Sequence, residues 1–154
     1  MSAAATLRLR DAERELVLAE LETIRAASAS PVYRKRVERL LHAARGSELD
    51  GELAAELERI LELALQSGRI RAVYGPGGEQ AALRLYRRTP GGAEVVASAG
   101  AVADALTTLA GQELESVGIT VVGPGAYQLT LAAGGVELSV RLDRQGARLA
   151  SVGA

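Results

Sequence analysis

The stretch "VGPGAYQLTLAAGGVELSVRLDRQGARLASV", residues 122–152, alternates apolar and polar residues between short glycine-containing turns. The turns "GPGA", "AAGG" and "DRQG" separate four strand-like runs: "VGITVV" at 117–122, "YQLTL" at 127–131, "VELSVRL" at 136–142 and "ARLASV" at 147–152. A period of two is typical of strands that bury one face and expose the other. Turns this short join antiparallel neighbours. The stretch therefore predicts a four-strand antiparallel meander.

A second glycine-proline stretch, "YGPGGEQAAL" at residues 74–83, carries almost the same turn. The runs beside it, "RIRAVY" and "AALRLY", also alternate, which predicts a hairpin turning at "GPGG". A phosphate-binding loop would instead need a helix to begin after the glycines, together with a GK[ST] or GxGxxG pattern. The chain contains neither pattern, so we expect neither turn to bind phosphate.

Helical periodicity dominates the residues before this hairpin. Asp11 is expected to cap a helix that runs to about Ala27, and Ser30 with Pro31 marks the start of a second. The third predicted helix has the strongest apolar stripe, with Leu57, Ile60, Leu61 and Leu65 expected to be buried, and it is expected to end at Gly68. A further helix, at 93–111, is rich in alanine and has only Glu94 and Asp104 as charges. A helix this apolar is typically buried on more than one side.

These elements indicate an α+β fold: three N-terminal helices followed by an antiparallel sheet of about six strands, ordered as hairpin, helix and four-strand meander. We expect a helical region at 1–68 and an α+β sheet region at 69–154, or one integrated domain. The chain has 154 residues, of which 48% are hydrophobic and 24% charged, as is usual for a globular protein.

The composition argues against several kinds of chemistry. The chain has no cysteine, which excludes disulfides, thiolate metal ligands and cysteine nucleophiles. His42 is the single histidine and lies between Arg39 and Arg45 on the second helix, so no histidine pair is present to hold a metal. We therefore expect no enzyme, no cofactor and no metal site. The net charge is −1, and "MSAAATLRLRD" at the N-terminus has no apolar segment, so we expect a cytoplasmic chain with no membrane partner.

Arginines collect on the predicted hairpin. Residues 69–92 carry five arginines and one glutamate. Folding the hairpin about its turn would gather a basic set on one face: Arg69, Arg71, Arg84, Tyr86 and Arg88. This set is the candidate surface for an anion or a partner. The alternative interpretation is a solvated face whose arginines pair with glutamates of the acidic third helix.

Two functions from different classes follow. The first is a non-catalytic interaction or assembly domain, self-associating or bound to a protein partner, because no catalytic set is present and helix 93–111 is made of small residues. The second is a nucleic-acid-binding regulator of winged-helix-like order, with the basic hairpin as its wing. The third helix is too acidic to face phosphates, so the basic second helix would have to read the groove.

Overall fold

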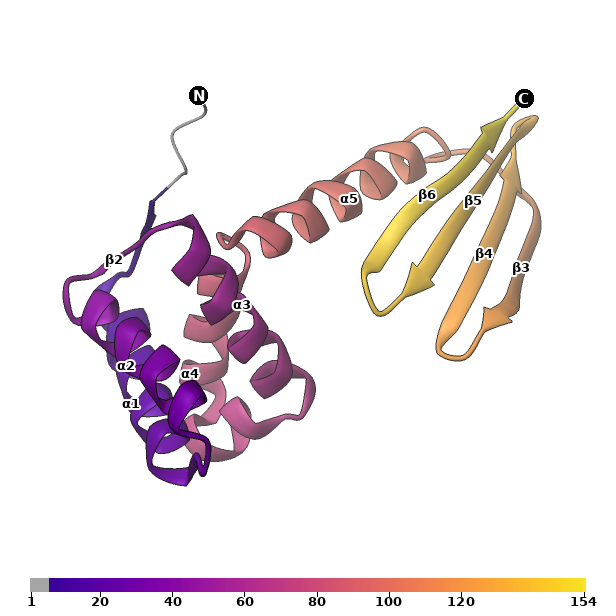
Figure 1. Cartoon of the computed structure of the whole chain (residues 1–154). Helices are drawn as coiled ribbons and strands as arrows, with labels where there is room; N and C mark the ends of the chain where they lie inside the picture. Colours follow the sequence, from indigo (N-terminus) through magenta and orange to yellow (C-terminus); the bar gives the residue numbers. More distant parts are fainter. Residues whose placement is uncertain (1–5) are drawn as a thin grey trace. The chain divides into compact units, whose positions relative to one another are not determined.

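The computed structural model describes residues 6–154, which fold as two compact units, one ending at Ala93 and one spanning Glu94–Ala154. The predicted α+β class is confirmed (Figure 1). The elements, in chain order, are β1 (Leu7–Arg8), α1 (Asp11–Ala27), α2 (Pro31–Arg45), β2 (Glu48–Leu49), α3 (Gly51–Gln66), α4 (Arg69–Tyr86), α5 (Pro90–Thr107), β3 (Leu114–Gly123), β4 (Ala126–Ala133), β5 (Val136–Asp143) and β6 (Gly146–Gly153).

Helices α1 to α4 surround the core of the first unit. Fully buried side chains come from every helix, among them Leu21, Leu40, Leu57, Ile70 and Leu85. The two-residue strands β1 and β2 pair antiparallel at its margin. The predicted stripe on α3 is confirmed in part: Leu57 and Leu61 are fully buried, whereas Ile60 and Leu65 are only partly buried against the same core.

The polar residues at helix starts behave largely as predicted. The Ser30 side chain accepts a hydrogen bond from the Tyr33 amide at 3.3 Å, and Pro31 is the first residue of α2. Helix α1 begins at Asp11 itself, so its capping position is Arg10 and not Asp11. Gly68, with φ of 73°, stands between α3 and α4.

The predicted hairpin at 69–88 is wrong, because this segment is helix α4. Gly75 alone departs from helical geometry, with φ 68° and ψ −173°, and Pro76 then begins a second helical segment. The residues after the turn are glutamate, glutamine, alanine, leucine and arginine, all good helix formers. Helical spacing also buries Ile70, Ala82 and Leu85 in the core of the first unit. The sheet therefore has four strands and not six.

The segment "TPGG" at 89–92 also begins a helix. The Thr89 hydroxyl accepts a hydrogen bond from the Gly92 amide at 3.3 Å, and Pro90 is the first residue of α5. Because α4 packs with α1 and α3, the units divide between Ala93 and Glu94. The boundary at 68–69 that the sequence predicted falls instead between two helices of one unit.

Substituting glycines in "YGPGG" should distinguish a helix from a hairpin at this segment. Gly77 is helical with open space around its α-carbon, so Gly77→Ala should raise the free energy of unfolding by about 0.4–1 kcal/mol. Gly75 has a positive φ that other residues avoid, so Gly75→Ala should lower it by about 1–3 kcal/mol. Urea unfolding followed by circular dichroism measures both. A loss of stability in Gly77→Ala would contradict the helical assignment.

The predicted meander is confirmed in the second unit. Strands β3, β4, β5 and β6 pair antiparallel in chain order. The turn at Gly123–Ala126 uses Gly125 at φ 67°, and the next uses Gly134 and Gly135 at φ 59° and 76°, as tight hairpins require. Val102 of helix α5 and Leu109, in the turn after it, form a small core with Leu138 and Val140 of β5.

Candidate interaction surfaces

The five residues predicted to share a strand face lie on α4 or just after it. Arg69 opens the helix, Arg71 follows, Arg84 and Tyr86 lie in its last turns, and Arg88 comes after its end. Their placement on one sheet face is therefore wrong. Arg69, Arg71 and Arg88 form ion pairs with carboxylates of the same unit.

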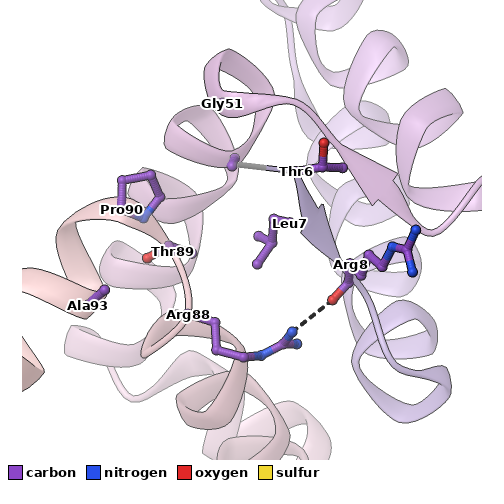
Figure 2. Close-up of a pocket in the computed structure, with 9 residues that line it drawn as sticks. Thr6, Leu7, Arg8, Gly51, Arg88, Thr89, Pro90 and Ala93 are labelled. Carbon is purple, nitrogen blue, oxygen red and sulfur yellow. Dashed lines mark hydrogen bonds between the residues drawn. The ribbon is translucent and has the colours of Figure 1, made fainter. Parts of the chain in front are cut away.

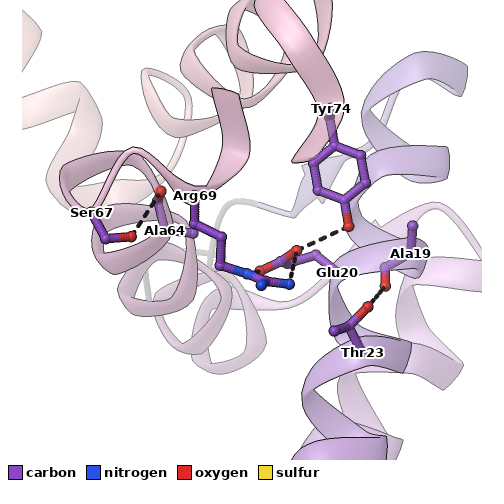
Figure 3. A network of polar contacts seen from close by, with 7 residues as sticks. All are labelled: Ala19, Glu20, Thr23, Ala64, Ser67, Arg69 and Tyr74. Carbon is purple, nitrogen blue, oxygen red and sulfur yellow. Dashed lines mark hydrogen bonds and ion pairs between the residues drawn. The ribbon is translucent and has the colours of Figure 1, made fainter. Parts of the chain in front are cut away.

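Arg69 belongs to a polar network around Glu20 of α1 (Figure 3). Its guanidinium donates to the two Glu20 oxygens at 2.8 and 3.2 Å, and the Tyr74 hydroxyl donates to Oε2 at 3.0 Å. The Glu20 side chain is only 4% exposed. The hydrogen bond to Glu20 and its negative charge raise the pKa of Arg69. A carboxylate this buried needs such partners, because removing a charge from water is costly.

Arg88 makes the equivalent contact with Glu13, one heptad earlier on α1. The Glu13 side chain is 2% exposed, and its Oε2 accepts from Arg88 and from the Arg10 amide, the latter at 2.9 Å. Arg88 also donates to the Arg8 carbonyl at 2.9 Å (Figure 2). Glu13 Oε1 has no hydrogen-bond partner among residues 6–154. The two buried glutamates thus hold both ends of α4 against α1.

The remaining candidates are more exposed. Arg71 pairs with Glu79 at 3.0 Å on the surface of α4. Arg84 is exposed, and among the described residues no carboxylate lies within ion-pair distance of it. Tyr86 is partly buried, and its burial together with Glu62 and Glu58 raises its pKa. The alternative interpretation placed the arginines' partners on the acidic third helix, but the buried pairs use α1.

Tyr74 gives this network a pH dependence. Burial, followed by its hydrogen bond to Glu20, raises the pKa of Tyr74 above its usual value of about 10. A raised tyrosine pKa stabilises the folded state below the unfolded pKa, and that contribution is lost as the pH rises through the folded pKa. As the pH rises above about 10, the free energy of unfolding should therefore fall less in Tyr74→Phe than in the wild-type chain. Urea unfolding as a function of pH measures this, with Tyr33→Phe as control. If the free energy of unfolding fell equally with pH in the wild-type chain and both variants, the prediction would be contradicted.

A pocket of the first unit lies beside the Arg88 contacts. It has a volume of about 690 Å³ and lies beside β1 and the starts of α3 and α5, and its only ionisable side chains are Arg8 and Arg88 (Figure 2). His42 is exposed on α2. Within residues 6–154, no three histidine, aspartate or glutamate side chains gather as a metal site would need.

The sheet of the second unit has an open apolar surface that the sequence analysis missed. Nine apolar side chains of β3, β4 and β5 share one face, because they are register partners across the three strands. They form three rows: Val117, Leu131 and Leu138; Ile119, Leu129 and Val140; and Val121, Tyr127 and Leu142. On β5, Leu138 and Val140 are buried with α5. On β3 the side chains are uncovered: Val117 is 58% exposed, Ile119 62% and Val121 72%. We call the face formed by β3 and β4 the open face.

Charge patterning was the signal that could have indicated this surface. Between Glu115 and Glu137 the chain carries no charged residue, although β3 is an edge strand. Edge strands are usually guarded by lysines or inward-pointing charges. β6, the other edge strand, carries Arg148 and lies near α5, where the Ser98 hydroxyl donates to the Ala147 carbonyl at 2.8 Å. Apart from Glu115 near its start, β3 is therefore an uncharged edge of the described sheet.

Comparison with protein-family models, curated proteins and solved structures finds no match to this chain. Among the helices of residues 6–154, none has the length and apolar character needed to cross a membrane.

Proposed function

We propose that this chain is a non-catalytic interaction or assembly domain that self-associates through the open face of its second unit. The observation that carries the proposal is the run of three exposed apolar side chains on β3, extended by Tyr127 of β4, which is 43% exposed. Contiguous exposed apolar patches are typical of protein interaction sites, whereas single exposed apolar residues are ordinary.

Burial of these side chains would supply a substantial part of the free energy that association needs. Fully burying a valine or isoleucine stabilises by about 1.5–3 kcal/mol. Scaled by their exposed fractions, Val117, Ile119 and Val121 would contribute on the order of 3–6 kcal/mol per copy. Two copies together reach the range of the rigid-body entropy lost on association, estimated at about 4–15 kcal/mol. The surrounding contacts would then decide the affinity.

Sedimentation equilibrium over a range of concentrations tests the proposal. The wild-type chain should show a mass above the 16.0 kDa monomer that rises with concentration. Ile119→Lys should raise the dissociation constant by at least about tenfold, because a lysine charge would have to be desolvated at the interface. Leu63→Lys is the matched control, since Leu63 is a 70% exposed apolar residue of α3 and should leave association unchanged. A monomer at every concentration would refute the proposal.

A second candidate function is nucleic-acid binding through α2. This helix buries Val37, Leu40 and Leu41, and its other side exposes a basic row: Arg34, Lys35, Arg36, Arg39 and Arg45. Arg45 is paired with Glu22 at 3.1 Å, and Arg39 lies 3.9 Å from Glu52. With α4 helical, the wing of a winged-helix arrangement is lost, and α2 alone supports this candidate. Retention on a DNA column that falls steeply with salt and is reduced in Lys35→Ala with Arg36→Ala would favour it.

A further inference from the structure

Helix α5 covers only part of the apolar face of the sheet. Ser98 of α5 donates to the Ala147 carbonyl at the start of β6, and Val102 is buried with Leu138 and Val140 of β5. Leu109, in the turn after α5, belongs to the same core. The side chains of β3 on the same face are left uncovered. The sheet thus has a second layer over β5, which partly covers Leu129 and Leu131 of β4. That layer has an open place over β3 and over Tyr127 of β4.

The open part of this layer can accommodate a pair of strands. A helix is about 10–12 Å across, and two packed sheets lie about 10 Å apart. A pair of strands from another sheet can therefore occupy the same layer as α5, beside it.

We propose that two copies of this chain form a two-fold dimer in which the open face of each lies on the open face of the other, each alongside the other's α5. This arrangement rests on the proposed self-association and adds its geometry. A two-fold axis brings a patch against the same patch, so the surface must be complementary to itself. The open face meets this condition because β3 and β4 carry no charged side chain beyond Glu115.

Interface size requires the helix as well as the strands. Two strands about 4.8 Å apart, each about 27 Å long for eight residues, present a footprint of roughly 260 Å². A stable interface buries about 800 Å² per partner, so the open face alone is too small. In the proposed dimer, each α5 also lies along the free edge of the other copy's β3. A helix placed there covers the unpaired edge, as natural sheets require.

The outer surface of α5 fits this role. Val96 is 47% exposed and Leu106 38% exposed. At about 100° per residue, Ala99 and Leu106 fall on one flank of the helix relative to the buried Val102. Glu94 and Ala101 fall on the other flank. One flank is therefore uncharged and can lie against a β3 edge. This also accounts for the apolar composition of α5, which the single-chain core uses only in part.

Crosslinking tests the arrangement directly, because the chain has no cysteine of its own. Ile119 lies on the open face and the neighbouring Thr120 on the opposite face of β3. In the full-length chain, Ile119→Cys should form a disulfide-linked or maleimide-linked dimer, whereas Thr120→Cys should not. Equal crosslinking of both variants would indicate edge-to-edge pairing of β3, which overturns the arrangement and leaves self-association intact.

The helix flank provides the second measurement. Leu106→Lys should raise the dimer dissociation constant by about tenfold or more, while Ala101→Lys on the other flank should change it by less than about twofold. Equal effects would overturn the placement of α5 against the second copy. If neither thiol variant crosslinks and the wild-type chain is monomeric at every concentration, the dimer and the proposed function both fail. A monomer whose Ile119→Cys thiol resists maleimide would show that another part of the same chain covers the open face.

Discussion

Arg88→Ala should lower the free energy of unfolding by about 3 kcal/mol. Removing one partner of a buried ion pair costs about 3–5 kcal/mol, because the other charge is left uncompensated. The Glu13 carboxylate is 2% exposed and would retain only the Arg10 amide. A third of the Arg88 side chain remains in contact with solvent, so we expect the lower end of that range. Urea unfolding followed by far-ultraviolet circular dichroism measures the loss.

The matched control is another arginine associated with α4. Arg71 pairs with Glu79 on the surface, with 65% of its side chain exposed, and exposed pairs contribute about 0–1 kcal/mol. Arg71→Ala should therefore stay within that range. Combining Arg88→Ala with Glu13→Gln should cost less than the sum of the single changes, because the buried charge is removed together with its partner. Additive losses, or equal losses at Arg71 and Arg88, would show that the Glu13 contact is not a stabilising buried pair.

Leu61→Ala should lower the free energy of unfolding by about 2–5 kcal/mol. The Leu61 side chain is 1% exposed in the core of the first unit, and truncation there removes apolar burial and leaves a cavity. Two residues away on the same helix, Leu63 is exposed, and Leu63→Ala should change stability by no more than about 0.5 kcal/mol. Comparable losses in the two variants would contradict the assignment of the buried face of α3.

The partners of the arginines at 69–88 could not be predicted from the sequence. The sequence identified these arginines as unusual and offered two interpretations, a binding surface or a face paired with glutamates. Pairing with glutamates is observed for Arg69, Arg71 and Arg88. The buried partners come from α1, because Glu13 and Glu20 lie seven residues apart on the side of that helix that meets α4. Binding of an external anion or partner by these residues stays a prediction.

The two glycine-proline turns illustrate the same limit. "GPG" at 123–125 turns a hairpin, as predicted, whereas "GPG" at 75–77 joins two helical segments. The flanks differ in a way that the sequence does contain: valine, isoleucine and threonine precede the first, and alanine, glutamine, leucine and arginine follow the second. The alternation in "ALRLY" is too short to distinguish a strand from a helix. In the observed helix, Leu85 is buried and Leu83 is partly exposed.

What the sequence determined by itself was local. The start of α2 follows from the capping side chain of Ser30 and from Pro31, and the meander follows from a period of two sustained over four runs joined by glycine turns. Only the tertiary structure decided that 69–86 is helical, because the choice depends on burying Ile70, Ala82 and Leu85 among distant helices. The tertiary structure also decided which apolar strand stays open. Alternation marks the inner face of all four strands alike, but a single helix is too narrow to cover that face, and α5 leaves β3 exposed.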